Sequence, residues 1–263
     1  MNAQGAHAIV TRDGEGRVRK RLHASTGDAR AHLEREYHYL ARLSEALAGQ
    51  PHLACPTPLS IERDERTLVM THCPGTPLDA LLADPESPFD AHAEHLAGQM
   101  AVALTAYVHA FREPYYSLSA ANLVFDADTG RLYLLDFTTG RTFPGVDERG
   151  AALEVSLGCL LARSIHHTVG PRSVWHRFLL KRYSQLLSNV LDHVPGRLDD
   201  AVMLHIAHQA RTALTARTAI DTLAGPAWQL RQAWHHGPGR ALFHHRVRSL
   251  VTRSSPRQPG PTP

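Results

Sequence analysis

The sequence predicts an α+β fold in two lobes, a small lobe built on an antiparallel sheet with one helix and a larger, mainly helical lobe. Before Cys73 the chain consists of short β-leaning runs separated by turn signals, with one helical stretch among them. Beyond the turn at Pro74-Gly75 helical periodicity dominates, and only two short strand-like runs interrupt it. The 263 residues, 43% of them apolar, are sufficient for two such lobes with a cleft between them.

The first lobe begins with a predicted β-hairpin. Residues 6 to 12 (AHAIVTR) and 17 to 23 (RVRKRLH) are β-leaning, and the DGEG sequence at residues 13 to 16 is a turn signal. Lys20 therefore falls in the middle of a strand.

A helix and a second hairpin complete the predicted first lobe. From residue 28 to residue 47 the apolar side chains follow helical spacing, and Glu36 lies on or beside the apolar face. Prolines at 56 and 58 break the chain, and the runs PLSIERD and TLVMTHC then form a hairpin around residues 64 to 66. We expect residues 1 to 73 to form this lobe.

The second lobe is predicted from residue 74 to residue 250. Its two strand-like runs are LVFD (123 to 126) and RLYLLDF (131 to 137), joined by a DADTG turn. The predicted helices span residues 77 to 83, 91 to 112, 151 to 168, 171 to 192, 197 to 220 and 226 to 236. Residues 251 to 263 have the composition of a disordered tail.

Composition argues against several classes of protein. No stretch approaches the roughly 20 apolar residues of a membrane span, and the N-terminus lacks a signal peptide's apolar region, so we expect a soluble cytoplasmic protein. The three cysteines are far apart, which argues against a disulfide framework or a zinc site. The 19 histidines form no HExxH motif, so they indicate no metal centre.

Positive charge is concentrated at the C-terminal end. From residue 231 onward the chain carries six arginines and no acid, although the formal net charge of the whole chain is only +3. With Trp234 and Phe243 among these cations, the segment is typical of an element that meets an anionic partner or a membrane surface. The alternative is a final helix that packs its aromatic side chains on the second lobe. There is no strong nucleic-acid signal.

Lysine is rare in this chain. Only two of its 28 cationic side chains are lysines, Lys20 and Lys181. Since arginine serves elsewhere, a lysine is a candidate for a task that a guanidinium cannot perform.

From about residue 4 to residue 192 the layout resembles the protein kinase superfamily. In kinases a strand lysine holds the ATP phosphates and is itself held by a glutamate of the following helix. Lys20 in VRKRL and Glu36 in LEREYHYL match these two positions. The alternative is two solvated surface charges.

The stretch YYSLSAANLVFDADTGRLYLLDFTTG carries the next part of the resemblance. It supplies Asn122 and Asp136 in the order of the kinase asparagine and aspartate that bind magnesium. Both flank predicted strands, at ends that would face one point, and both offer the oxygen ligands that Mg²⁺ prefers. The resemblance thus implies ATP and Mg²⁺ as cofactors.

The catalytic loop departs from the kinase pattern. Counting back from Asn122, Tyr115 replaces the usual histidine and Ser117 replaces the catalytic aspartate. A serine cannot accept the proton of a substrate hydroxyl as a carboxylate does, and loss of a general base costs roughly 10²- to 10⁴-fold in rate. Thr138 also replaces the glycine that follows the aspartate and phenylalanine in kinases.

Among kinases the chain is most similar to compact, atypical members, the kinase subunit of the KEOPS tRNA-modification complex and the lipopolysaccharide-core kinases. Gly5 in QGAHA resembles the short phosphate loop of the former, although an ordinary strand start is an alternative. Thr71 to Cys73 resemble the hinge whose backbone meets adenine. Glu154 would brace the catalytic loop, or is a surface glutamate.

Three hypotheses follow. In the first, the chain is a pseudokinase that binds Mg-ATP and presents a nucleotide-dependent surface to a partner. In the second, it is a working phosphotransferase that acts on a protein hydroxyl or a lipopolysaccharide sugar, with Glu113 or the substrate replacing the missing base. In the third, it is a scaffold that binds no nucleotide. The joint presence of Lys20, Glu36, Asn122 and Asp136 argues against the third.

Overall fold

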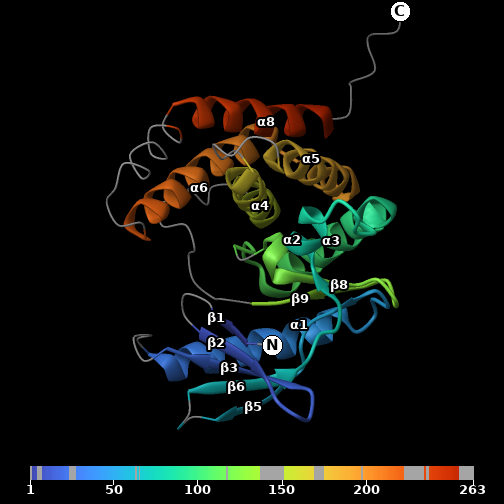
Figure 1. Cartoon of the computed structure of the whole chain (residues 1–263), viewed down its shortest axis with the longest axis vertical. Helices are drawn as coiled ribbons and strands as arrows, with labels where there is room; N and C mark the ends of the chain where they lie inside the picture. The colour runs from blue at the N-terminus through green and yellow to red at the C-terminus, as the bar shows by residue number, and fades with distance from the viewer. Residues whose placement is uncertain are drawn as a thin grey trace, which may run out of the picture. The chain divides into compact units, whose positions relative to one another are not determined.

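The fold is known from a computed structural model of the chain. It describes residues 2–4, 8–23, 28–62, 64, 66–116, 118–136, 151–168, 175–196, 198–221, 234 and 237–254. The chain divides into a first unit, Met1–Leu78 with Ala121–Gly140, and a second unit, Asp79–Ala120 with Arg141–Pro263. The first unit carries the strands and one long helix, and the second is helical (Figure 1). The predicted α+β class is confirmed.

The first unit contains a five-stranded antiparallel sheet. In spatial order its strands are β1 (Asn2–Gln4), β2 (Ala8–Arg12), β3 (Arg17–Leu22), β6 (Thr67–Thr71) and β5 (Pro58–Glu62). Both predicted hairpins, β2 with β3 and β5 with β6, are present. The first turn forms because the Asp13 carboxylate accepts hydrogen bonds from the backbone N–H groups of Glu15 and Arg17.

Helix α1 (Ala29–Leu47) follows β3 and begins where the sequence predicts. The Asp28 carboxylate accepts a hydrogen bond from the backbone N–H of Ala31 at 3.0 Å, which caps the helix. Four leucines at helical spacing, Leu33, Leu40, Leu43 and Leu47, form its buried face, and Glu36 is buried among them. The helix contacts strands of both sheets of the first unit, β5 and β6 in one and β4 in the other.

The second sheet of the first unit includes the predicted hairpin after residue 120. Its order is β4 (Leu53–Ala54), β9 (Arg131–Leu134), β8 (Leu123–Asp126) and β7 (Thr76–Pro77). Strands β4 and β9 are parallel, and the other pairs are antiparallel. The sequence analysis assigned this hairpin to the lobe of residues 74 to 250. The structure places it in the first unit, because β4 and β7, which are too short to show a strand pattern, pair with its two edges.

Gly75 lets the chain pass close to β8. Its φ of +115° is unfavourable for any residue with a side chain, and a Cβ atom there would lie 2.4 Å from the carbonyl oxygen of Phe125. The glycine is therefore required for the antiparallel pairing of Thr76 with Phe125.

The second unit consists of helices α2 (Leu78–Ala83, whose first residue belongs to the first unit), α3 (Phe89–Phe111), α4 (Ala152–Thr168), α5 (Trp175–His193), α6 (Asp200–Asp221) and α8 (Pro238–Ser254). The predicted helix at 226 to 236 falls almost entirely outside the described residues. Helix α8 continues through residues 251 to 254, so the predicted tail boundary is too early. None of the helices described is both long and apolar enough to cross a membrane.

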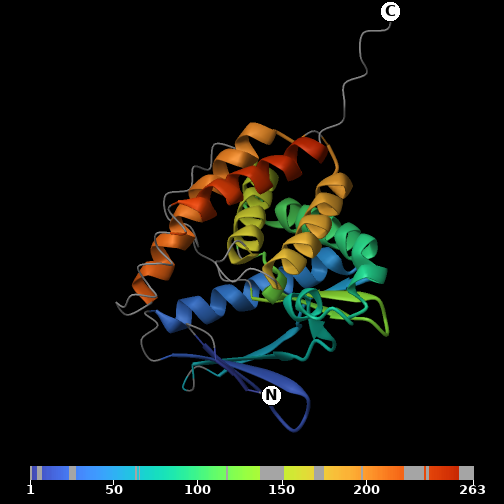
Figure 2. The same cartoon turned by 45° about the horizontal axis from the view of Figure 1, so that its top comes forward.

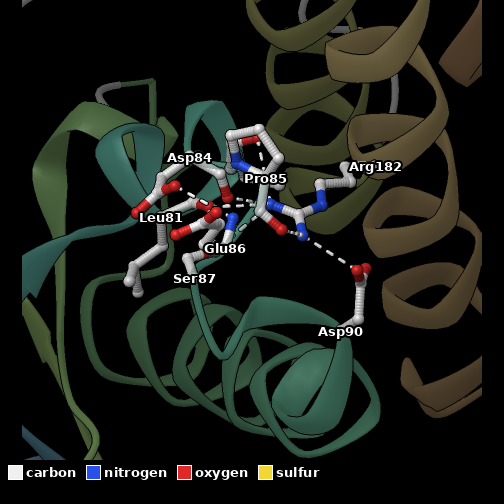
Figure 3. Close-up of polar contacts among 8 residues, drawn as sticks. Leu81, Asp84, Pro85, Glu86, Ser87, Asp90 and Arg182 are labelled. Atoms are coloured by element: carbon white, nitrogen blue, oxygen red, sulfur yellow. Dashed lines mark hydrogen bonds and ion pairs between the residues drawn. The ribbon is translucent and has the colours of Figure 1, made fainter.

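Arg182 on α5 holds the connection between α2 and α3 (Figure 3). Its side chain is 2% exposed and forms an ion pair with Asp90 at 2.8 Å. The guanidinium also donates to the hydroxyl of Ser87 and to the carbonyl oxygens of Leu81, Leu82, Asp84 and Pro85. Some of these are carbonyls that the end of α2 leaves without a helical partner. The arginine thus acts as a side-chain cap for that helix end.

Candidate functional site

Lys20 lies at the centre of a buried charge cluster in the first unit. It sits in the middle of β3, paired with Val10 and Leu68 of the neighbouring strands, and is 9% exposed. Its Nζ lies 2.6 Å from Oε1 of Glu36 and 2.7 Å from Oδ1 of Asp136. Burial acts to lower the pKa of Lys20, but the charges of the two carboxylates outweigh it and hold the pKa above its ordinary value. The ammonium is therefore charged at neutral pH.

Glu36 is the more deeply buried of the two carboxylates, at 2% exposure. Its Oε2 atom is buried and accepts no hydrogen bond from a described residue. The His32 Nε2 is 3.9 Å from this oxygen, but burial lowers the pKa of His32 despite the neighbouring carboxylate, so the imidazole is neutral at pH 7. Lys20 is therefore the cation that makes the burial of Glu36 tolerable.

Asp136 has a left-handed backbone, with φ of +55°. Aspartate tolerates this region better than most residues, and such conformations cluster at functional sites. Its side chain is 40% exposed, and Oδ2 takes no hydrogen bond from the described part of the chain. One oxygen thus holds Lys20, and the other is available to a ligand.

The β8–β9 hairpin brings Asn122 and Asp136 to the same end. The last paired residues of the ladder are Leu123 and Leu134, and one step further the backbone N–H of Leu135 donates to the carbonyl oxygen of Asn122 at 2.8 Å. Asn122 precedes β8 and Asp136 follows β9 by two residues. The structure therefore places the two predicted magnesium ligands at one hairpin end in the first unit.

The donor set at this hairpin end fits magnesium rather than a transition metal. It consists of one carboxylate and one amide, which are hard oxygen ligands. The described residues contain no group of three or more histidine, cysteine, aspartate or glutamate side chains that could hold a metal ion. Magnesium characteristically binds through one or two carboxylates together with substrate phosphates and water. Asn122 and Asp136 would therefore hold magnesium only together with the oxygens of a phosphate ligand.

The predicted hinge begins at the last residue of β6 in the same unit. The Thr71 backbone N–H donates to the carbonyl oxygen of Thr57, and its hydroxyl accepts from the Thr57 N–H at 2.8 Å. The Thr71 N–H is therefore already hydrogen-bonded within the first unit, contrary to the expectation that the backbone groups of Thr71 to Cys73 all face adenine. The backbone groups of His72 and Cys73 form no hydrogen bond with described residues. Burial, and then Cys55, raises the pKa of Cys73 to about 12, so the thiol stays neutral.

The start of the predicted catalytic loop lies in the second unit. Tyr115 is 2% exposed, and its ring stacks on Tyr107 at 4.3 Å between centroids. Its backbone N–H donates to Oγ of Ser156 at 2.8 Å, and that hydroxyl donates in turn to the carbonyl oxygen of Ala152. Ser117, Gly5 and Thr138 lie outside the described residues.

Glu154 forms no hydrogen bond with the described residues of the predicted catalytic loop. Its Oε1 accepts a hydrogen bond from the backbone N–H of Asp199 at 3.4 Å. The backbone of Tyr115 is held instead by Ser156, two residues later on α4, a contact that the sequence analysis missed. The signal was a serine inside the otherwise apolar run VSLGCLL. In the same unit the Tyr107 hydroxyl donates to Oε1 of Glu113 at 3.2 Å.

Comparison with known proteins gives similarities of structure and none of sequence. No family model matches the chain. A search of curated proteins finds no match either. Among solved structures the chain is similar to a crystal structure of Rad53 residues 1–466 in complex with AMP-PNP, with 18% identity and a TM-score of 0.43. The similarity covers 93% of this chain but only 63% of that one, so this chain spans less than two thirds of its length.

Proposed function

We propose that this chain is a protein-kinase-like nucleotide-binding protein that holds Mg-ATP in its first unit and transfers phosphate slowly or not at all. The observation that carries the proposal is the buried contact of Lys20 with both Glu36 and Asp136. A buried strand lysine held between two carboxylates is one of two lysines in a chain that otherwise uses arginine. Stability alone does not explain it, because apolar residues of similar volume often stabilise a core as well or better.

Each predicted residue has a distinct part in binding. The Lys20 ammonium would bind phosphate oxygens, and Glu36 would keep that side chain extended toward them. Asn122 and Asp136 would hold magnesium, which neutralises the charge of the phosphates. The backbone groups of His72 and Cys73, which form no hydrogen bond with described residues, would form hydrogen bonds with adenine.

Slow transfer follows from the catalytic loop. With Ser117 in place of a carboxylate, no side chain at that position accepts the proton of the attacking hydroxyl. We expect turnover to be depressed by roughly 10²- to 10⁴-fold. Such a protein acts through a partner that senses whether nucleotide is bound.

Thermal unfolding of the full chain with ATP, with and without magnesium, tests the nucleotide site. We expect a magnesium-dependent rise in Tm for the wild type, since a ligand that binds only the folded state stabilises it. Lys20→Met should abolish the rise, and Lys181→Met, which changes the other lysine, should retain it. Absence of any rise in the wild type would refute the proposal. Calorimetric titration of Lys20→Met with ATP separates lost binding from lost stability.

A working phosphotransferase is the second candidate, and the fixed position of Glu113 favours it. The Tyr107 hydroxyl holds this carboxylate four residues before Ser117. Phosphoryl transfer depends mainly on positioning and charge stabilisation, so a substitute base is enough. Transfer of labelled phosphate to a protein or a lipopolysaccharide sugar, lost in Asp136→Ala and raised in Ser117→Asp, would establish it. Transfer that is indistinguishable from that of Asp136→Ala would leave the pseudokinase.

A further inference from the structure

Helices α6 and α8 of the second unit join cationic side chains far from each other in sequence. The two helices lie alongside each other (Figure 2). We define the arginine–histidine cluster as His208 and Arg211 of α6 with Arg240, His244 and Arg248 of α8. The three α8 residues recur every fourth position, which places them on one side of the helix.

The adjacent face of α8 is committed to the core. Phe243, Val247 and Val251 are at most 1% exposed. The sequence analysis considered this segment as an amphipathic element for a membrane surface or as a helix packed on the second lobe. Insertion into a membrane would need the apolar side of α8 to be free, so the structure favours the packed helix. What α8 offers to a partner is its cationic side.

A directed chain of hydrogen bonds runs through the cluster. Arg240 Nε lies 3.3 Å from Nε2 of His244, and Nδ1 of His244 lies 2.9 Å from Nε2 of His208. A guanidinium can only donate, so Nε2 of His244 accepts and its proton is on Nδ1, which donates to His208. The proton of His208 is then on Nδ1, which is buried and has no acceptor among the described residues. Both imidazoles are therefore neutral.

Neither of the two helices places a carboxylate within the cluster. Helix α8 contains no acid, and the only acids of α6 are Asp200 and Asp221 at its two ends. Burial is the main cause that lowers the pKa of His244, followed by Arg240, Arg211 and Arg248. Arg240 and Arg248 form no ion pair with a described residue. The like charges oppose one another, and a bound anion would relieve this repulsion.

We propose that the arginine–histidine cluster binds a single phosphate monoester group. The phosphate oxygens would accept hydrogen bonds from the remaining N–H groups of Arg240 and from the guanidinium of Arg248. A guanidinium donates in the planar geometry that suits phosphate. The two arginines are about 12 Å apart along the helix axis, a gap that two long side chains can close around one phosphate. His244, which is oriented by His208, accepts a hydrogen bond from Arg240 and fixes the position of that side chain.

A single phosphate fits better than a nucleic-acid strand. Strands bind through aromatic rings that stack on bases as well as through cations. The Phe243 ring beside this cluster is fully buried, with the Arg211 guanidinium 5.2 Å from its centroid, so it cannot stack on a base. Both proposed donors, Arg240 and Arg248, also lie on the one helix α8.

Calorimetric titration of the full chain with inorganic phosphate, at constant ionic strength in a chloride background, tests the proposal. We expect saturable 1:1 binding that weakens about tenfold or more in Arg240→Gln and in Arg248→Gln, as for loss of a charge-assisted contact. Arg246→Gln removes the same charge from an exposed position outside the cluster on the same helix and should change the Kd by less than about twofold. Lys20→Met should bind phosphate as the wild type does, which separates this site from the proposed nucleotide site.

Three results would overturn the proposal. Equal weakening in Arg246→Gln would show only a diffuse positive field, and loss of binding in Lys20→Met would place the phosphate in the first unit. Binding of a short single-stranded RNA without binding of inorganic phosphate would show a polyanion surface. A phosphoserine peptide titrated in parallel identifies the source of the group. Tighter binding than that of inorganic phosphate indicates a phosphorylated side chain, and equal binding indicates a small free ligand.

Discussion

At the scale of single residues, the charge pair of Lys20 and Glu36 is the best-defined feature of the candidate site. Each is almost fully buried, and Glu36 keeps one oxygen without a hydrogen bond. The sequence was sufficient to find both residues. A rare lysine in a strand and a glutamate on an apolar helix face are each unusual, and an ion pair between them explains both. The contribution of Asp136 to the same ammonium could not be predicted, since it is a tertiary contact between residues 116 positions apart in the sequence.

We predict that Lys20→Met destabilises the fold by about 3 kcal/mol or more, because it leaves Glu36 buried without a cation. Lys20→Met combined with Glu36→Leu should recover most of this loss, since the double change removes both buried charges. Urea unfolding of the two single variants and the double variant completes the cycle. An equally unstable double variant would show that packing, not charge, is the cause.

The histidine pair gives a prediction about pH. Burial, and then His244 and the nearby arginines, lowers the pKa of His208 to about 4 from the ordinary 6.5. Between pH 6.5 and 4 the unfolded chain binds a proton that the folded chain does not, so the stability contribution of His208 falls as the pH falls. In His208→Asn the decline in Tm over this range should be shallower than in the wild type. His205→Asn, an exposed histidine on the same helix, is the control, and parallel curves for wild type and His208→Asn would contradict the prediction.

At the scale of elements, sequence patterns predicted the long pieces and missed the short ones. The β2–β3, β5–β6 and β8–β9 hairpins and the helices with clear apolar periodicity all occur close to their predicted ranges. Strands β4 and β7 have two residues each, too few to show alternation, and their pairing depends on segments distant in sequence. The brace from Ser156 to Tyr115 was missed for a similar reason, since a tertiary hydrogen bond leaves no periodic signal.

The Arg182 cap is also an element-scale feature that the sequence does not reveal. We predict that Arg182→Met destabilises the chain by about 3 kcal/mol or more, because several buried carbonyl groups lose their donor at once. Arg177→Met, at an exposed position on the same helix, should change the free energy of unfolding by less than about 0.5 kcal/mol. Chemical denaturation of the two variants tests this, and equal effects would show that the hydrogen bonds of Arg182 contribute nothing beyond its methylene groups.

At the scale of the whole molecule, the predicted nucleotide residues that the structure describes all belong to the first unit. Lys20, Glu36 and the hinge come from its N-terminal part, and Asn122 and Asp136 come from the hairpin that returns to it. The sequence predicted these residues but not this grouping, because the pairings of the hairpin with β4 and β7 are non-local. The second unit contributes the segment that precedes Ser117 and the arginine–histidine cluster.

The central claim is that a nucleotide binds beside Lys20, and lysine labelling tests it most directly. The chain is treated with an ATP acyl phosphate, which acylates lysines next to bound nucleotide, and the two lysine peptides are quantified by mass spectrometry. Lys20 is buried and held protonated by two carboxylates, so it should react only with a reagent bound beside it. The account predicts that Lys20 is labelled in the presence of magnesium and that excess ATP suppresses this label but not the slow labelling of Lys181. Labelling of Lys20 no faster than that of Lys181, or labelling that ATP does not suppress, would contradict it.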